Sequence, residues 1–195
     1  MVTVQTGLTL EEFLTLPEEK PALEYLDGVV TQKMAPVGPH GKLQFTIAKW
    51  LDRASGEGEI AETFTELRAN WVDRASLVPD VSVYLVERVP TTPDGDIDDQ
   101  FWVPPDIAVE VASPGQSINE LTTRAKLLLA NGVRAVLVVD RRPRQVRLAR
   151  PGRPIVTFRG EDVVTVEDVL PGFAFVVQDL FAALRMRRPG SRPAR

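Results

Sequence analysis

Two stretches of the chain carry apolar residues at helical spacing. Residues 40–54 and 117–131 repeat leucine, isoleucine or alanine every three or four positions, which is typical of one face of an amphipathic helix. A shorter helix is expected over 8–20, where Thr9 and Glu12 match a capping box. The pattern therefore predicts two main helices and a short helix near the amino terminus.

Strand patterns fill most of the remaining chain. Asp27-Gly28 stands between apolar residues within 24–34, which indicates a hairpin with a two-residue turn. Residues 135–139 (AVLVV) are wholly apolar, as in the middle of a sheet. Residues 87–104 form a polar excursion. The other expected elements are strands at 59–64, 66–72, 80–86, 107–112, 145–149, 155–158 and 173–177, and a short helix near 179–185.

This order of elements predicts one α/β or α+β domain whose central sheet is flanked by the two main helices. We expect the domain to span 1–184 and the basic segment 185–195 to be a disordered tail. No apolar run approaches the roughly 18 residues of a membrane span. The first lysine is Lys20, so the basic start of a signal peptide is absent. A cytoplasmic protein without a membrane partner is therefore expected.

Composition restricts the chemistry that the chain can perform. It has no cysteine and one histidine, His40, which excludes disulfides, thiolate zinc sites, iron–sulfur clusters and sites with several histidines. A metal would be held mainly by carboxylates, which favours magnesium, manganese or calcium. The acidic loop 94–99 resembles part of a calcium loop but lacks its distal glutamate, so a solvated loop is expected.

Positive charge is concentrated in two segments. Residues 141–153 and 185–195 contain 11 of the 23 basic residues and no acidic residue, so 12 basic residues face all 27 acidic ones elsewhere. One interpretation is a solvated hairpin followed by a disordered tail. The other is a phosphate-facing patch that includes Arg141, Arg142 and Arg144.

Two carboxylates interrupt the strand pattern. Asp80 begins strand 80–86 on the face opposite its valines, and Glu110 lies among the valines of 107–112. Ionised carboxylates are rarely buried unless they are paired or bound to metal. If the two strands are neighbours, Asp80 and Glu110 converge, and their repulsion favours a bound divalent cation. The alternative is that Glu110 pairs with an arginine on a partly exposed face.

A lysine on the second long helix is a further candidate. Lys126 falls at the border of the apolar stripe of 117–131. From there it either reaches a polar site at the edge of the sheet or extends into solvent.

Several short motifs follow one another in a characteristic order. They are PDVSV at 79–83, PPDIAVEVASP at 104–114 and NGVRAVLVVD at 131–140, with LEYLDGVV at 23–30 and Pro39-His40 upstream, and LPGFAFVVQDLF at 170–181 downstream. Together, over residues 8–184, they resemble the bacterial Uma family of restriction-endonuclease-like proteins in the PD-(D/E)XK nuclease superfamily. The resemblance implies a restriction-endonuclease-like core with a central mixed sheet and additional strands at both termini.

The resemblance also implies a metal site. Asp80 matches the aspartate of the PD motif, and Glu110 matches the acidic residue of the (D/E)XK motif. They would hold Mg²⁺ or Mn²⁺ together with the Val111 carbonyl, and Glu24 matches an early acidic residue that acts through water. The ion would lower the pKa of a bound water and stabilise charge on the phosphate.

The chain departs from the motif at the lysine. Ala112 occupies the lysine position two residues after Glu110. Lys126 matches the place of a lysine that has moved to the following helix, where it would orient the attacking water. His40 matches a family histidine whose role is uncertain.

Three functions are weighed on these residues. The first is a Mg²⁺-dependent endonuclease that hydrolyses phosphodiester bonds in DNA, where a homodimer would supply the two active sites that cutting both strands needs. The second is a catalytically inactive nucleic-acid-binding or interaction module on the same fold, which Ala112 favours; the net negative charge does not suggest tight DNA binding. The third is a glycosidase that uses two carboxylates without metal, although three tryptophans and two tyrosines offer little surface for stacking on sugars.

Overall fold

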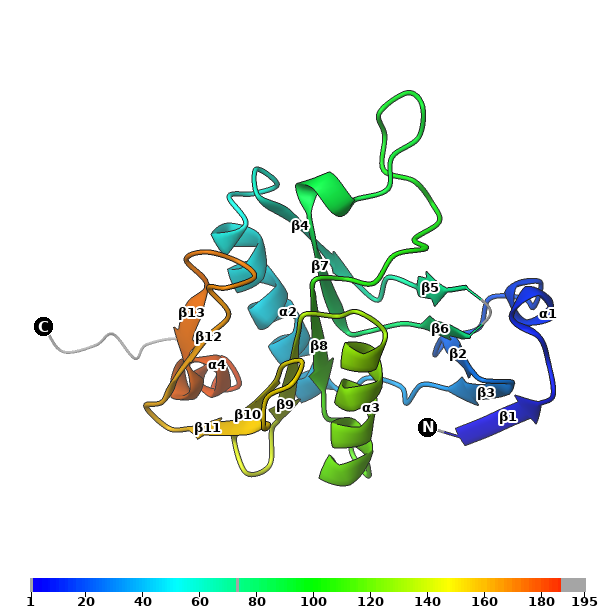
Figure 1. Ribbon diagram of the computed structural model, residues 1–195. Coiled ribbons are helices and arrows are strands. Elements are labelled where there is room, and N and C mark those ends of the chain that lie inside the picture. The colour runs from blue at the N-terminus through cyan, green and yellow to red at the C-terminus, as the bar shows by residue number, and fades with distance from the viewer. Residues whose placement is uncertain (1, 73, 187–195) are drawn as a thin grey trace, which may run out of the picture.

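The chain folds around a six-stranded mixed sheet, which the computed structural model describes together with the rest of residues 2–72 and 74–186 (Figure 1). In this sheet the parallel neighbours are β8 and β9, and every other pair is antiparallel. The strands in spatial order are β11 (Val156–Arg159), β10 (Gln145–Ala149), β9 (Ala135–Asp140), β8 (Ile107–Val111), β7 (Val81–Leu85) and β4 (Ala61–Thr65).

The two long helices cover opposite faces of this sheet, α2 (Gly38–Ala54) on one and α3 (Ile118–Ala130) on the other (Figure 1). Successive residues of a strand point to opposite faces. Accordingly, Val109 of β8 belongs to the apolar cluster that includes α2, and its neighbour Ala108 belongs to the cluster that includes α3. The prediction of an α+β fold with a central mixed sheet and two flanking helices is confirmed.

A second sheet, wholly antiparallel, is built mainly from the amino-terminal part of the chain. Asp27 and Gly28 have φ angles of 46° and 85°, as a type I′ hairpin turn requires. The sequence reading missed two strands of this sheet, β1 and β6. The strands in spatial order are β1 (Val2–Thr6), β3 (Val29–Gln32), β2 (Leu23–Leu26), β6 (Ala75–Leu77) and β5 (Ala69–Trp71).

The first helix, α1 (Leu10–Leu14), is shorter than the predicted helix over 8–20. Its capping box between Thr9 and Glu12 forms as expected. The helix ends at Leu14 and is capped by Thr15, two residues before Pro17. Proline cannot donate the next helical hydrogen bond, and it disfavours helical backbone in the residue before it. The predicted helix was therefore too long at its carboxyl end.

The carboxyl-terminal part packs on the α2 side of the central sheet. It consists of β12 (Val163–Thr165), β13 (Ala174–Val176) and the short helix α4 (Val177–Ala182). Most of the predicted basic tail, residues 187–195, lies outside the described residues. None of the helices in the described part of the chain has both the length and the apolar character to cross a membrane.

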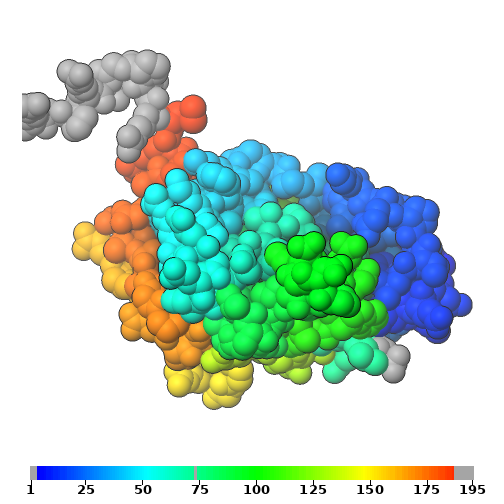
Figure 2. All heavy atoms as spheres, turned by 90° about the horizontal axis from the view of Figure 1, so that it is seen from above, coloured from blue at the N-terminus to red at the C-terminus, as the bar shows by residue number. Residues whose placement is uncertain are grey.

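The polar excursion after β7 is anchored by one aromatic side chain. After a short 3-10 helix (Val86–Arg88), the chain returns to the body of the protein at Phe101, which is buried. The Phe101 ring centroid lies 4.9 Å from that of Tyr84 and 5.3 Å from that of Phe64. Figure 2 shows this green segment on the upper face, between the blue amino-terminal and the orange carboxyl-terminal parts.

Candidate active site

The strand register brings the two predicted carboxylates to the same cavity. Val81 of β7 pairs with Val109 of β8 in antiparallel register. Continuing this register by one residue places Asp80, just before β7, opposite Glu110 of β8. Both side chains are buried. Both line a cavity of about 20 Å³. The expectation that these strands are neighbours and that the two carboxylates converge is met.

Asp80 is held in its ionised form by its neighbours. Its Oδ1 accepts a hydrogen bond from Lys33 Nζ at 2.8 Å, and its Oδ2 accepts one from the Val111 N–H at 2.7 Å. His40 Nε2 lies 3.4 Å from Oδ2. Burial opposes the charge, but the hydrogen bonds and charges of His40 and Lys33 outweigh it and lower the pKa of Asp80.

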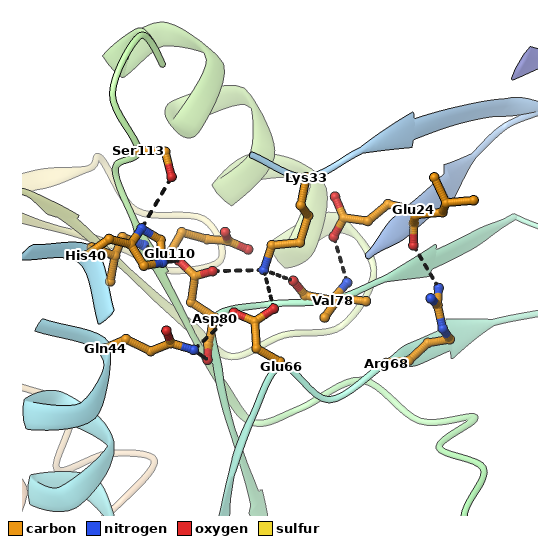
Figure 3. Close-up of polar contacts among 12 residues, drawn as sticks. Glu24, Lys33, His40, Gln44, Glu66, Arg68, Val78, Asp80, Glu110 and Ser113 are labelled. Carbon is orange, nitrogen blue, oxygen red and sulfur yellow. Dashed lines mark hydrogen bonds and ion pairs between the residues drawn. The ribbon is translucent and has the colours of Figure 1, made fainter. Parts of the chain in front are cut away.

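Lys33, at the end of the β2–β3 hairpin, was not predicted as a site residue. Its Nζ donates to three oxygens: Asp80 Oδ1 at 2.8 Å, Glu66 Oε2 at 2.8 Å and the Val78 carbonyl at 2.9 Å (Figure 3). Although burial favours the neutral amine, the carboxylates of Asp80, Glu110, Glu66 and Glu24 raise the pKa of Lys33. Lys33 therefore stays protonated and carries a positive charge within the cavity.

Glu110 lies in a buried ion-pair network with Arg124 and Glu24. Arg124 Nε donates to Glu110 Oε1 at 2.7 Å, and the two terminal nitrogens of the same guanidinium donate to the two oxygens of Glu24 at 2.7 and 2.9 Å. Glu24 Oε1 also accepts a hydrogen bond from the Val78 N–H at 2.7 Å. Glu110 therefore pairs with an arginine, as the alternative interpretation of the sequence predicts, but the pair is buried and does not lie on a partly exposed face.

Lys126 lies outside this group. Its side chain is exposed, and it is absent from the residues that line the cavity within the described part of the chain. At about 100° per residue, Lys126 lies roughly 200° around α3 from Arg124, so the two side chains point in nearly opposite directions. The sequence did contain a signal for Arg124, because it lies three residues after Leu121 and four before Leu128, within the apolar stripe.

His40 enters the cavity from the first turn of α2. The side chain is buried, and its Nδ1 lies 3.3 Å from Ser113 Oγ. On the same helix, Gln44 Nε2 donates to Glu66 Oε1 at 3.0 Å and to the Asp80 carbonyl at 2.8 Å. Glu66, like Lys33, was missed by the sequence reading, because it follows β4 in an exposed, charged stretch that shows no pattern of burial.

A divalent cation fits the donor groups of this cavity. One ligand atom each of His40, Glu66 and Asp80 lies within 4.8 Å of the others. Carboxylate oxygens are the ligands that Mg²⁺ prefers, and Mn²⁺ accepts an imidazole nitrogen as well. The other predicted ligands, Glu110, Val111 and Glu24, line the same cavity, and Glu24 is linked to Glu110 through Arg124.

The three predicted arginines fall into two places. Arg141 and Arg142 line a neighbouring cavity of about 420 Å³, which shares Ser113 and Gln116 with the cavity of Asp80. Arg144 lines a different cavity, near α4. The structure therefore brings the first two close to the candidate site and separates the third from them.

A mixed sheet in which Asp80, just before β7, lies opposite Glu110 of β8, with a helix on each face, defines a protein of the restriction-endonuclease-like class. The Uma2 family model, described as "Putative restriction endonuclease", matches residues 10–180. The chain belongs to this family.

A solved structure supports the same grouping. The crystal structure of "a putative nuclease belonging to DUF820 from Anabaena variabilis ATCC 29413" is 32% identical in sequence and superposes with a TM-score of 0.87. The match covers 92% of this chain and all of that one. No curated protein matches the chain significantly.

Replacing Arg124 should destabilise the fold far more than replacing Lys126. Arg124→Met leaves Glu24 and Glu110 buried without their cation, and breaking a buried pair in this way costs about 3–5 kcal/mol. Lys126→Met changes an exposed position and should stay within about 0.5 kcal/mol of wild type. Urea unfolding of the two variants measures the difference. Similar free energies of unfolding for both would show that the network contributes little.

Stability should fall as the pH rises from about 5 to 7.5 in the presence of a chelator. Burial, opposed by Arg124 and assisted by Asp80, raises the pKa of Glu110 to about 7. Over this window Glu110 keeps its proton in the folded state but has lost it in the unfolded state. The free energy of unfolding therefore falls as the pH rises and levels off above about 7. The loss from this group is on the order of 2 kcal/mol.

The control for this pH effect is Glu110→Gln, which removes the titrating group and keeps an oxygen that can accept from Arg124. Asp80 does not disturb the comparison, because its lowered pKa places its contribution below pH 5. Urea unfolding at pH 5 and at pH 7.5 should show a smaller difference for the variant than for wild type. Equal differences would assign the pH dependence to other groups.

Proposed function

We propose that this chain is a metal-dependent nuclease that hydrolyses phosphodiester bonds in DNA. The observation that carries the proposal is the convergence of Asp80, Glu110, His40 and Lys33 on one cavity, with the exposed Glu66 bound to Lys33 beside it, in a chain of the Uma2 family. A homodimer would supply the second active site that cutting both strands of a duplex needs.

The metal would be held at Asp80, the residue common to both sets of candidate ligands. One set adds Glu110 and the Val111 carbonyl, and the other adds His40 and Glu66. Bound there, Mg²⁺ or Mn²⁺ would lower the pKa of a bound water and would stabilise negative charge on the phosphate oxygens.

The protein's own side chains have separate tasks in this proposal. Lys33 supplies a positive charge close to the carboxylates, the role that the sequence assigned to Lys126, and such a charge stabilises the negative charge that develops in phosphoryl transfer. Arg124 keeps the Glu110 carboxylate in a fixed orientation. Lys33 is in direct contact with Asp80, whereas Lys126 is exposed.

A catalytically inactive nucleic-acid-binding module is the second candidate. Two observations favour it: Ala112 stands at the lysine position of the motif, and Asp80 and Glu110 already have cationic partners in Lys33 and Arg124. Turnover separates the two candidates, because a binding module would bind DNA without cutting it.

Purified wild type should nick supercoiled plasmid DNA in Mg²⁺ or Mn²⁺ and lose this activity in a chelator. Asp80→Asn removes a charged ligand and should lower the nicking rate on the order of 10²-fold or more, the loss typical of an electrostatic catalytic group. Asp52→Asn, an exposed change on α2, is the matched control and should cut like wild type. If wild type binds DNA but never cuts plasmid or single-stranded DNA with either ion, the binding module is the better description.

The cavity beside the site suggests that Arg141 and Arg142 contact phosphates of the bound strand. Each lost phosphate contact lowers the slope of log affinity against log salt by roughly 0.7 to 0.9. Replacing both arginines with alanine in an Asp80→Asn background should therefore flatten the slope by about 1.5. Arg144→Ala, in a different cavity, should leave it unchanged. Fluorescence anisotropy at several salt concentrations measures the slopes, and equal slopes in all variants would return the segment to a solvated hairpin.

A further inference from the structure

The ammonium of Lys33 is surrounded like a bound cation. It has three N–H donors, and each one has an acceptor at 2.8 to 2.9 Å: Asp80 Oδ1, Glu66 Oε2 and the Val78 carbonyl oxygen. Two of these three oxygens belong to carboxylates. Figure 3 shows the lysine reaching into the middle of the group from the end of the hairpin, with the acidic side chains pointing toward it.

The same two carboxylates belong to the group that can hold a metal. Glu66 and Asp80 converge with His40 so that one ligand atom of each lies within 4.8 Å of the others. The cavity measures about 20 Å³, which is room for roughly one water molecule. A divalent ion on these carboxylates would lie within a few ångströms of the Lys33 ammonium, where two positive charges repel strongly in a poorly solvated site.

Departure of Lys33 would leave the carboxylates in position. Glu66 Oε1 is held by Gln44 Nε2, which also donates to the Asp80 carbonyl. Asp80 Oδ2 is held by the Val111 N–H. None of these bonds involves Lys33. The ligand group is therefore fixed by α2 and β8, while its resident cation comes from a separate element, the β2–β3 hairpin.

We propose that a divalent cation binds to His40, Glu66 and Asp80 by exchange with the Lys33 ammonium, which neutralises these ligands when no metal is bound. The exchange rests on the proposed function, and it identifies which of the two candidate ligand sets around Asp80 binds the ion. Arg124 does not take part, because it is paired with Glu24 and Glu110. Once displaced, the ammonium would be free to pair with a phosphate of the substrate.

The test is the affinity for Mn²⁺ alone, measured by isothermal titration calorimetry without DNA. Lys33→Met keeps the length of the side chain and removes its charge, so the ion no longer competes with an ammonium. We expect at least about 10-fold tighter Mn²⁺ binding than in wild type, as the loss of a nearby like charge in a buried site predicts. Lys49→Met, an exposed change on α2, is the matched control and should change the affinity by less than about 2-fold.

Two more variants keep the result interpretable. Lys33→Gln is a second neutral replacement in case Lys33→Met does not fold, as judged by circular dichroism. Lys33→Arg keeps the charge and should bind Mn²⁺ no more tightly than wild type. Equal or weaker Mn²⁺ binding by both neutral variants overturns the exchange, and the proposed nuclease stands if wild type still binds Mn²⁺ and cuts DNA. If neither wild type nor the neutral variants bind Mn²⁺, the exchange and the metal-dependent function fall together.

Discussion

The buried guanidinium of Arg124 joins three parts of the fold that are distant in sequence. It comes from α3, pairs through two nitrogens with Glu24 of the smaller antiparallel sheet, and pairs through Nε with Glu110 of the central sheet. A planar guanidinium presents its donors in a rigid fork, so it can pair through two nitrogens with one carboxylate and through Nε with another. The relative position of the two sheets at the site therefore depends on this residue. Because Glu24 also accepts from the Val78 N–H, the network reaches the chain just before Asp80.

Lys33 is the second cation of the site: it pairs with Asp80 and Glu66, whereas Arg124 pairs with Glu24 and Glu110. Four acidic residues surround the cavity or its immediate partners: Glu24, Glu66, Asp80 and Glu110. Glu24, Asp80 and Glu110 are buried, and burying several carboxylates together is unfavourable unless cations neutralise part of their charge. Arg124 is tied into the fold on both sides, whereas Lys33 extends from the end of a hairpin. This difference supports the proposal that Arg124 is a structural element and that Lys33 exchanges with a metal ion.

The site lies where the fold changes from antiparallel to parallel pairing. Asp80 precedes β7, and Glu110 is in β8, which pairs with β7 on one side and with the parallel strand β9 on the other. The chain leaves β8 through the turn that contains Ser113 and enters α3, which carries Arg124. A single strand and its crossover helix thus supply both the carboxylate and its partner. The cavity lined by Arg141 is next to this turn.

The sequence by itself determined the elements whose signals are local. The two long helices follow from apolar spacing, the hairpin follows from Asp27-Gly28, and the capping box of α1 follows from two residues three positions apart. Glu110 could be singled out because a carboxylate within a run of valines has no local explanation. The short strands β1 and β6 were missed, because a three- to five-residue strand at low hydrophobicity is recognised only by its partner strand.

The tertiary structure alone decided which cations meet these carboxylates. Lys33 and Asp80 are 47 residues apart, and Glu24 and Arg124 are 100 apart, so no periodicity within one element can reveal either pair. On α3 the family resemblance favoured Lys126, and Arg124 was not predicted. The orientation of the helix on the sheet chose the arginine, because position 124 belongs to the buried stripe and position 126 does not. Burial then fixed its role, since a charge in the interior must find partners and a charge at the surface need not.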